Sequence, residues 1–419
     1  MPETTPTPAA RTHCAGFDWA KDHHDVVIVN SQGQIVTEFR FEHSAAGWQE
    51  FRQRVRDFPG LCVAIETSRG AAIEQLLASG VTVYPVHPKS AKSYRARQVP
   101  SGTKTDRYDA WALADALRTD GHAWRTLTAA DPLVERLRLL CRDEVVLIEQ
   151  RTALVNQLQQ ALLEYYPALL EAFDDWTLPA AWDCVARFPT PQALQQAGQR
   201  KWEKFLHVHR LARPQTYEKR LEIFARATAF CGSEAVTAAK SQLAVTLVKL
   251  LCTLAGQLDH YRAQIERLFR EHPDHDLFGS LPGAGPKLRA RLLSEVLTRP
   301  DVHDNPAALQ ALAGTAPVSF QTGKIRYALL RHQCNDHLRH TVHLWADQAR
   351  RYCTWAAVYY QAHRDKGHSH AAALRCLGNR LLKILSKMIA THTVYDPELH
   401  ARNQQRHGSW VLQLQPAKT

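Results

Sequence analysis

Four carboxylates in the first third of the chain are spaced as metal-binding residues often are. Asp18 and Glu66 each end an apolar run, whereas Asp106 and Asp109 open a helical pattern with i, i+3 spacing. Acids at the ends of neighbouring strands and on one helical face can converge on one point. Converging carboxylates repel, and hard divalent cations with oxygen ligands relieve that repulsion. Two such ions can clamp the attacking and leaving oxygens of a phosphoryl transfer.

Each acid taken alone has a simpler interpretation, because a solvated loop end or a helix cap also uses Asp and Glu. The joint placement of Asp18, Glu66, Asp106 and Asp109 favours a metal site. An oxygen-only ligand set suits an ion that keeps several waters, so Mg²⁺ is the expected cofactor, with Mn²⁺ as the alternative.

Strand and helix signals alternate along the segment that must position these acids. We expect strands ending at Asp18 and at Glu66, a hairpin of strands 26–29 and 35–41, helices at 45–58 and 71–79, and a strand at 81–86. Three strands in a row, followed by alternating helices and strands, predict a mixed sheet between helices. This is the order of a ribonuclease-H-like fold.

The middle of the chain has a long helical pattern at 133–166 that returns at 243–269. Two such amphipathic helices often pair as an antiparallel coiled coil. The segment between them is helical and aromatic, and we expect its Trp176, Trp182, Trp202 and Phe205 to be core residues. The class is therefore α/β plus all-α. We predict a disordered tail at 1–11, domains at 12–125, 126–272 and 273–400, and a tail at 401–419.

The excess positive charge is concentrated at one end of the 419-residue chain. Residues 281–419 contain 19 Lys and Arg against 8 Asp and Glu, whereas the rest carries 33 of each, so this segment accounts for the whole net charge of +11. A basic domain beside an acidic metal-type site predicts a polyanionic partner such as nucleic acid. Nine cysteines without a CxxC pair, no signal peptide and no membrane-length apolar run predict a reduced protein of the cytoplasm without a membrane partner.

Three groups of basic residues are candidates for contacts with a nucleic-acid backbone. The polar segment 88–105 is expected to be a mobile loop, and a Pro-Gly-x-Gly turn at 282–285 resembles a helix–hairpin–helix turn whose amides could bind phosphate. A solvated loop and a plain interhelical turn are the alternatives. The candidates are Lys89, Lys92, Arg95, Arg97 and Lys104, then Lys287, Arg289 and Arg291, and finally Lys324, Arg326, Arg331 and Arg339.

A Gly- and Pro-broken segment at 313–324 holds the hydroxyls of Ser319 and Thr322 beside Lys324. Such a loop can present a nucleophile to a phosphodiester, and an ordinary polar turn is the alternative. Histidines then recur with i, i+3 spacing from His337 to His343. This stripe does not suit a closed tetrahedral zinc site, so we expect a DNA-facing or packed helix there.

These motifs in this order resemble the DEDD transposases of the insertion-sequence 110 family. The resemblance covers most of residues 12–390. The residues at 16–21, 64–66 and 104–110 are similar to that family's acid motifs, and those at 281–285, 314–317 and 334–339 to the landmarks of its C-terminal domain. The resemblance implies a RuvC-like catalytic domain containing the four acids, Mg²⁺, and a C-terminal transposase domain with a nucleophilic serine. It also implies DNA as substrate, a structured guide RNA and a homo-oligomer, dimer or tetramer, in a bacterial cytoplasm.

One departure from the family pattern concerns the nucleophile. The family has Ser directly before Gly, whereas this chain has Thr322 before Gly323, and Ser319 lies three residues earlier. We therefore expect a recombinase that cleaves and exchanges DNA strands, with Thr322 as nucleophile and Ser319 as its rival. A metal-dependent junction-resolving nuclease and a non-catalytic nucleic-acid-binding protein are the alternatives. A covalent protein–DNA adduct would exclude both.

Overall fold

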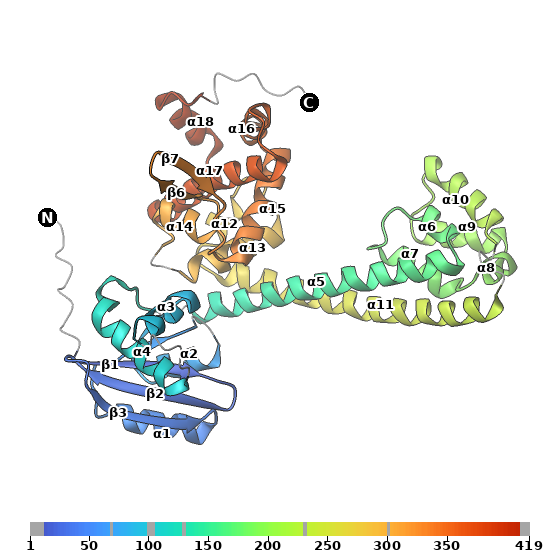
Figure 1. Cartoon of the computed structure of the whole chain (residues 1–419). Helices are drawn as coiled ribbons and strands as arrows, with labels where there is room; N and C mark the ends of the chain where they lie inside the picture. The colour runs from blue at the N-terminus through green and yellow to red at the C-terminus, as the bar shows by residue number, and fades with distance from the viewer. Residues whose placement is uncertain are drawn as a thin grey trace. The chain divides into compact units, whose positions relative to one another are not determined.

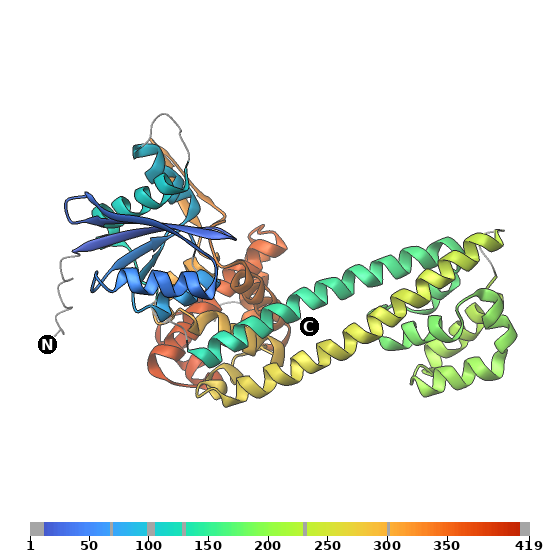
Figure 2. The ribbon, with the colours of Figure 1, turned by 90° about the horizontal axis from the view of Figure 1, so that it is seen from below.

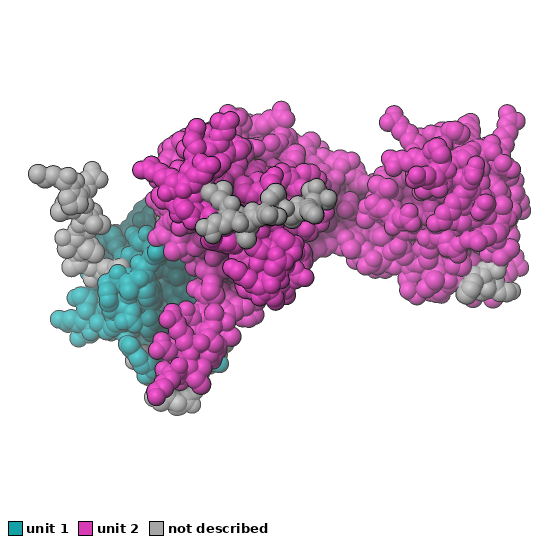
Figure 3. Space-filling model, turned by 90° about the horizontal axis from the view of Figure 1, so that it is seen from above, with its two compact units in different colours: residues 1–129 teal, residues 130–419 magenta. Residues whose placement is uncertain are grey.

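The computed structural model describes residues 12–67, 70–98, 105–127, 131–228, 233–299 and 302–410. The chain divides into two compact units, residues 1–129 and 130–419 (Figure 3). The predicted tail at 1–11, Lys104 and the end of the tail at 401–419 lie outside the described residues.

The first unit is built on a five-stranded mixed sheet (Figure 1). Its order is β3-β2-β1-β4-β5; β1, β2 and β3 are antiparallel neighbours, whereas β1, β4 and β5 run parallel. The strands are β1 (His13–Trp19), β2 (His23–Asn30), β3 (Ile35–Glu42), β4 (Cys62–Ile65) and β5 (Thr82–Pro85). The predicted mixed α/β domain is confirmed.

Helices cover both faces of this sheet, so its central strands are apolar on both sides. On β2, Val26 and Ile28 belong to one core and Val27 and Val29 to the other. The first core includes α1 (Ala45–Val55) and α2 (Ala71–Ala78), and the second α3 (Pro88–Gln98) and α4 (Asp106–Asp120). The short 3₁₀ helix η1 (Gly121–Ala123) follows α4.

The second unit begins with two long helices, α5 (Pro132–Tyr165) and α11 (Glu234–Glu271), which pack side by side and antiparallel (Figure 2). Between them lie α6 (Ala168–Ala172), α7 (Pro179–Arg187), α8 (Pro191–Ala197), α9 (Gln199–Val208) and α10 (Pro214–Arg226). The aromatic residues predicted for this core are all buried. By length and composition, α11 is also one weak candidate for a membrane span, although it packs along α5.

The rest of the second unit is helical apart from one hairpin. Its elements are α12 (His275–Gly279), α13 (Pro286–Leu297), α14 (Pro306–Leu312), β6 (Val318–Thr322), β7 (Ile325–Leu329), α15 (Asp336–Tyr352), α16 (Thr354–Asp365), α17 (His370–Thr391) and α18 (Pro397–Arg406). Val134 and Leu137 of α5 and Leu268 of α11 share one core with Trp345 of α15. The base of the long helix pair and the C-terminal helices are thus packed as one body.

Two segments that were predicted to be loops have regular structure. Residues 88–98 form α3, because Ala91 is buried against the sheet and Tyr94 packs on Trp124, which gives this polar segment an anchored side. Residues 318–329 form the β6–β7 hairpin. The Gly-x-Gly turn before α13 packs on α15, since a Cβ on Gly283 would lie 2.7 Å from the Cα of Ala349.

Candidate active site

Strand register brings three acids to one end of the sheet. Asp18 pairs directly with Asp25 across the antiparallel β1–β2 ladder. Phe17 pairs with Ile65 in the parallel β1–β4 ladder, so the next residues, Asp18 and Glu66, follow neighbouring strands in step. Directly paired residues direct their side chains to the same face of a sheet. That face is the one covered by α4, since Cys14 and Val27 share it by alternation.

The absence of a side chain at Gly16 brings α4 against this face. A Cβ on Gly16 would lie 1.7 Å from the carbonyl oxygen of Ala110 and 2.6 Å from the amide nitrogen of Ala114. The helix begins at Asp106 because Thr105 caps it: the Oγ1 of Thr105 accepts a hydrogen bond from the amide of Tyr108. The first turn of α4, which carries Asp106 and Asp109, is thereby placed beside the strand ends.

The electrostatics of Asp18 show that these acids converge. The pKa of Asp18 is raised to about 7, first by burial and then by the negative charges of Asp109, Asp106, Asp25 and Glu66, in that order of size. The four predicted acids therefore meet, and Asp25 joins them. We call these five residues the acid cluster. A shared site of this kind suits one or more cations with oxygen ligands.

Basic side chains already pair with part of the acid cluster. The Nη1 of Arg95 on α3 lies 2.6 Å from the Oδ1 of Asp109. The guanidinium of Arg40 lies 2.8 Å from Asp25 and 3.2 Å from Asp106. These ion pairs offset some of the repulsion among the carboxylates.

The ring of His23 completes the exposed side of the acid cluster. Its Nε2 lies 3.6 Å from Asp106, and ligand atoms of His23, Asp25 and Asp106 lie within 4.8 Å of one another. Asp25, His23 and Arg40 were not among the site residues predicted from the sequence. For Asp25 there was a signal, since a hairpin between the first two strands places it opposite Asp18.

The predicted basic residues of the first unit lie on α3. Lys89, Lys92 and Arg97 are exposed there, whereas Arg95 is turned inward to Asp109. The described part of this group therefore includes both a solvent-facing basic surface and one internal counterion.

The basic residues of the second unit separate into exposed and internal ones. Lys287, Lys324 and Arg326 are exposed. Arg291 is buried and pairs with Glu144 at 2.7 Å, so it joins α13 to α5 and the structure does not place it at the surface. Arg289 is also turned inward, over the ring of Phe269.

Two further arginines stabilise the segments on either side of the hairpin. The Nε of Arg331 donates to the carbonyl oxygen of Ala316 at 3.2 Å. Arg339 pairs with Asp336 at 3.0 Å and donates to the carbonyl oxygens of Arg331 and His332. Both arginines therefore fix the ends of the hairpin, whose tip is left exposed.

The two candidate nucleophiles lie on opposite faces of this hairpin. Thr322 is the last residue of β6 and pairs with Ile325 around a two-residue turn, in which Gly323 has φ +55°. Ser319 pairs with Ala328, three positions back along β6, so alternation directs it to the other face. The Thr322 face is apolar and exposed; it carries Val318, Phe320, Ile325, Tyr327 and Leu329.

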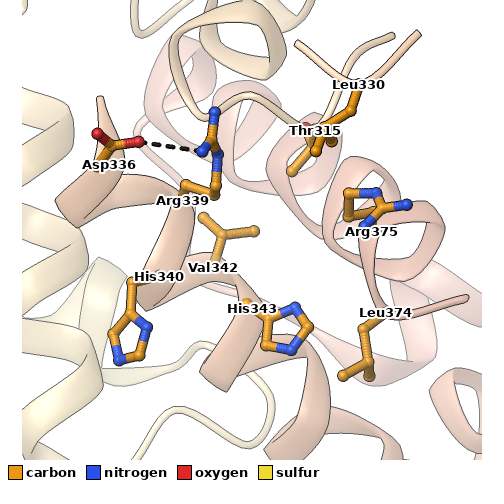
Figure 4. Close-up of a pocket in the computed structure, with 9 residues that line it drawn as sticks. All are labelled: Thr315, Leu330, Asp336, Arg339, His340, Val342, His343, Leu374 and Arg375. Carbon is orange, nitrogen blue, oxygen red and sulfur yellow. Dashed lines mark ion pairs between the residues drawn. The ribbon is translucent and has the colours of Figure 1, made fainter. Parts of the chain in front are cut away.

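A basic pocket of about 310 Å³ lies at the base of the hairpin (Figure 4). Its position follows from Thr315, which precedes β6, and Leu330, which follows β7. The other residues that line it are Asp336, Arg339, His340, Val342, His343, Leu374 and Arg375. Two members of the histidine stripe, His340 and His343, thus line this pocket.

Comparison with known proteins identifies the family. Residues 15–167 match a family model described as "Transposase", and residues 275–361 match one described as "Transposase IS116/IS110/IS902 family". The protein "Mini-circle putative transposase for IS117" of Streptomyces coelicolor is 31% identical over 91% of this chain and 95% of its own length. The "Insertion element IS900 uncharacterized 42 kDa protein" of Mycobacterium paratuberculosis is 27% identical over 91% of this chain and 97% of its own length. The chain therefore belongs to the IS110/IS116 family of insertion-sequence transposases.

Proposed function

We propose that this transposase cleaves and exchanges DNA strands with a divalent metal held by Asp18, Glu66, Asp106 and Asp109. The convergence of four further carboxylates on Asp18 is the observation that carries the proposal. The donor set fits Mg²⁺ or Mn²⁺, because the cluster offers carboxylate oxygens and is open to water on the Asp106 side. Once bound, such ions would stabilise the charge on attacking and leaving phosphoryl oxygens.

The sheet supports a RuvC-like, ribonuclease-H-like identity for the first unit. In its order β3-β2-β1-β4-β5, the first acid lies on the central strand and the second directly follows the adjacent parallel strand. The remaining acids come from the helix that packs on the central strand at Gly16. This geometry follows from register and one glycine contact, both of which are independent of any motif comparison.

Thr322 is the proposed nucleophile. Its Oγ1 would bond to the phosphorus while the bond from phosphorus to the leaving deoxyribose oxygen breaks, and its proton would pass to a base. Lys324 and Arg326 lie near Thr322 on the hairpin. As cations they can bind the phosphate, but they cannot accept the proton of the hydroxyl. Activation of the hydroxyl would therefore come from the carboxylate–metal site of another subunit, as the family resemblance suggests.

The partners follow from charge and family. The basic surplus of residues 281–419 suits DNA, and the family resemblance adds a structured guide RNA and a dimer or tetramer in a bacterial cytoplasm. Sequencing of RNA that copurifies with the chain from its native locus tests the RNA partner directly. Recovery of bulk cellular RNA alone would contradict this part of the proposal.

Strand cleavage by the full chain on DNA with the element's ends tests the proposal. Asp106→Asn should abolish cleavage without loss of folding, whereas Asp22→Asn, an exposed acid in the same unit, should leave cleavage unchanged. Cleavage by Asp106→Asn at the wild-type rate, or cleavage in excess chelator, would contradict the metal site. Metal-dependent cutting without a covalent adduct would instead favour the junction-resolving nuclease.

A further inference from the structure

A second set of metal-type ligands lies in the other unit, between α16 and α17. His363 is in the last turn of α16, His368 follows that helix, and Cys376 is in the second turn of α17. One ligand atom from each residue lies within 4.8 Å of the other two. None of these residues was predicted to be a metal ligand, because their spacing in the sequence is not that of a short metal motif.

The backbone turn between the two helices folds His368 back toward His363. Gly367 has φ +85°, a left-handed conformation that glycine adopts without strain. The amide of Gly367 donates to the carbonyl oxygen of Arg364 at 2.9 Å, and that of His368 donates to the carbonyl oxygen of His363 at 3.2 Å. The turn therefore fixes the two histidines on the same side as Cys376.

The ring of His363 supplies a second, independent observation. Both of its nitrogens are buried and neither has a hydrogen-bond partner. Its neighbours are the aromatic rings of Tyr359, His368 and Trp410, at centroid distances of 4.8, 5.0 and 6.0 Å. A buried polar atom without a partner is destabilising, and coordination of a metal ion would remove that penalty for one nitrogen.

We propose that His363, His368 and Cys376 bind a zinc-class ion that joins α16 to α17. Two imidazole nitrogens and one thiolate are ligands that Zn²⁺ prefers and Mg²⁺ does not. Zn–N bonds of about 2.0 Å and Zn–S bonds of about 2.3 Å give tetrahedral ligand separations of about 3.3–3.6 Å. The Sγ of Cys376 lies 3.9 Å from the Nδ1 of His368, so a shift of a few tenths of an ångström closes this edge.

Water occupies the fourth position of the proposed site, and the thiol proton of Cys376 is released to solvent when the ion binds. The site is chemically separate from the acid cluster, which offers oxygen ligands for a hard cation. Leu374 and Arg375 line the basic pocket (Figure 4). They directly precede Cys376 in the sequence of α17. The ion would therefore stabilise one wall of that pocket.

Titration of the full chain with Co²⁺ tests the proposal, since a cobalt–thiolate bond gives a near-ultraviolet charge-transfer band that carboxylate ligands cannot produce. We expect a band that saturates at one Co²⁺ per chain and is displaced by Zn²⁺. Cys376→Ser should lose the band, and Cys252→Ser, which removes an exposed thiol on α11, should retain it.

A second variant, His368→Ala, keeps the test valid if Cys376→Ser does not fold. His368 is exposed, so His368→Ala should fold, and it should weaken Zn²⁺ binding at least tenfold in competition with a chromophoric chelator. Zn²⁺ should raise the melting temperature of the wild type and not that of either variant. Absence of the cobalt band from the wild type, or its persistence in Cys376→Ser, would overturn the proposal.

Discussion

Gly16 of β1 and Ala110 of α4 meet backbone to backbone, so closely that a Cβ on Gly16 would lie 1.7 Å from the Ala110 carbonyl oxygen. No side chain fits between the strand and the helix at this point. The contact lies two residues before Asp18 on β1 and one residue after Asp109 on α4. It therefore sets the distance between the strand acids and the helix acids.

Gly16→Ala should push α4 away from the sheet. Overpacking of this kind costs about 1–3 kcal/mol or more, and here it should also weaken Mn²⁺ binding, measured by calorimetry. Gly256→Ala is the matched control, because Gly256 is exposed in the middle of α11 and its Cβ would meet nothing within 4 Å. A Gly→Ala change within a helix should stabilise the protein by about 1 kcal/mol. Wild-type Mn²⁺ affinity in Gly16→Ala would show that the contact does not position the acids.

Asp18→Asn should make stability less dependent on pH when metal is chelated. The pKa of Asp18 rises from 3.8 to about 7 on folding, so the folded protein binds this proton more tightly than the unfolded chain does. Ionisation of Asp18 therefore costs stability as the pH rises from about 4 to 7. The variant lacks this cost.

After allowance for solvent screening, Asp18→Asn should raise the free energy of unfolding by about 1 kcal/mol at pH 8 and leave it unchanged near pH 4. Hydrogen exchange of β1 and β2 peptides in excess chelator measures it locally. Added Mn²⁺ should reverse the order of stability at pH 8, since only the wild type has the full ligand set. Equal hydrogen-exchange protection of the wild type and Asp18→Asn at pH 8 would mean that ionisation of Asp18 does not destabilise the folded protein.

Much of this architecture could be predicted because it depends on local periodicity. Val26–Val29 on β2 form a continuous apolar run, as expected for a strand buried on both faces, and the leucines of α5 recur with a period of 3.6. Both elements were predicted correctly. The aromatic core between α5 and α11 was also predicted, because tryptophan is costly to expose.

Most of the features that were not predicted from the sequence depend on contacts between distant segments. Segment 88–98 has too few apolar residues for a helical pattern, and one buried position, Ala91, anchors it through tertiary packing. Asp25 and Arg40 joined the acid cluster through strand pairing, which composition does not reveal. The β6–β7 hairpin had a usable signal, since Val318 to Leu329 alternates around a two-residue turn with glycine first.

Glu144→Ala should destabilise the second unit strongly. Glu144 is buried and accepts from Arg291 of α13 and Arg262 of α11, so one carboxylate on α5 compensates two guanidinium groups. Its removal leaves Arg291 charged in a site that excludes water, which costs about 3–5 kcal/mol. Asp143→Ala, at the exposed neighbouring position, should change the free energy of unfolding by less than about 0.5 kcal/mol. Urea denaturation followed by circular dichroism distinguishes the two variants, and similar midpoints would rule out a stabilising role for the network.

Thr322 and Ser319 can be separated because the hairpin directs them to opposite faces. Thr322 shares its face with Phe320 and Tyr327, whose ring centroids lie 5.0 Å apart and whose side chains are exposed. Aromatic rings of this kind can stack an unpaired base, at about 1–3 kcal/mol per base. A strand held on this face would present its phosphate to Thr322 rather than to Ser319.

We therefore expect Thr322→Ala to abolish the covalent DNA adduct and Ser319→Ala to retain it, as detected by denaturing electrophoresis of the full chain with labelled substrate. Thr322→Ser should keep or raise activity, because loss of the β-methyl group frees χ1 and reduces crowding at the hydroxyl. Phe320→Ala should weaken adduct formation about 5- to 150-fold if it removes one stacked base. The opposite pattern, with an adduct in Thr322→Ala and none in Ser319→Ala, would assign the chemistry to Ser319 and to the other face of the hairpin.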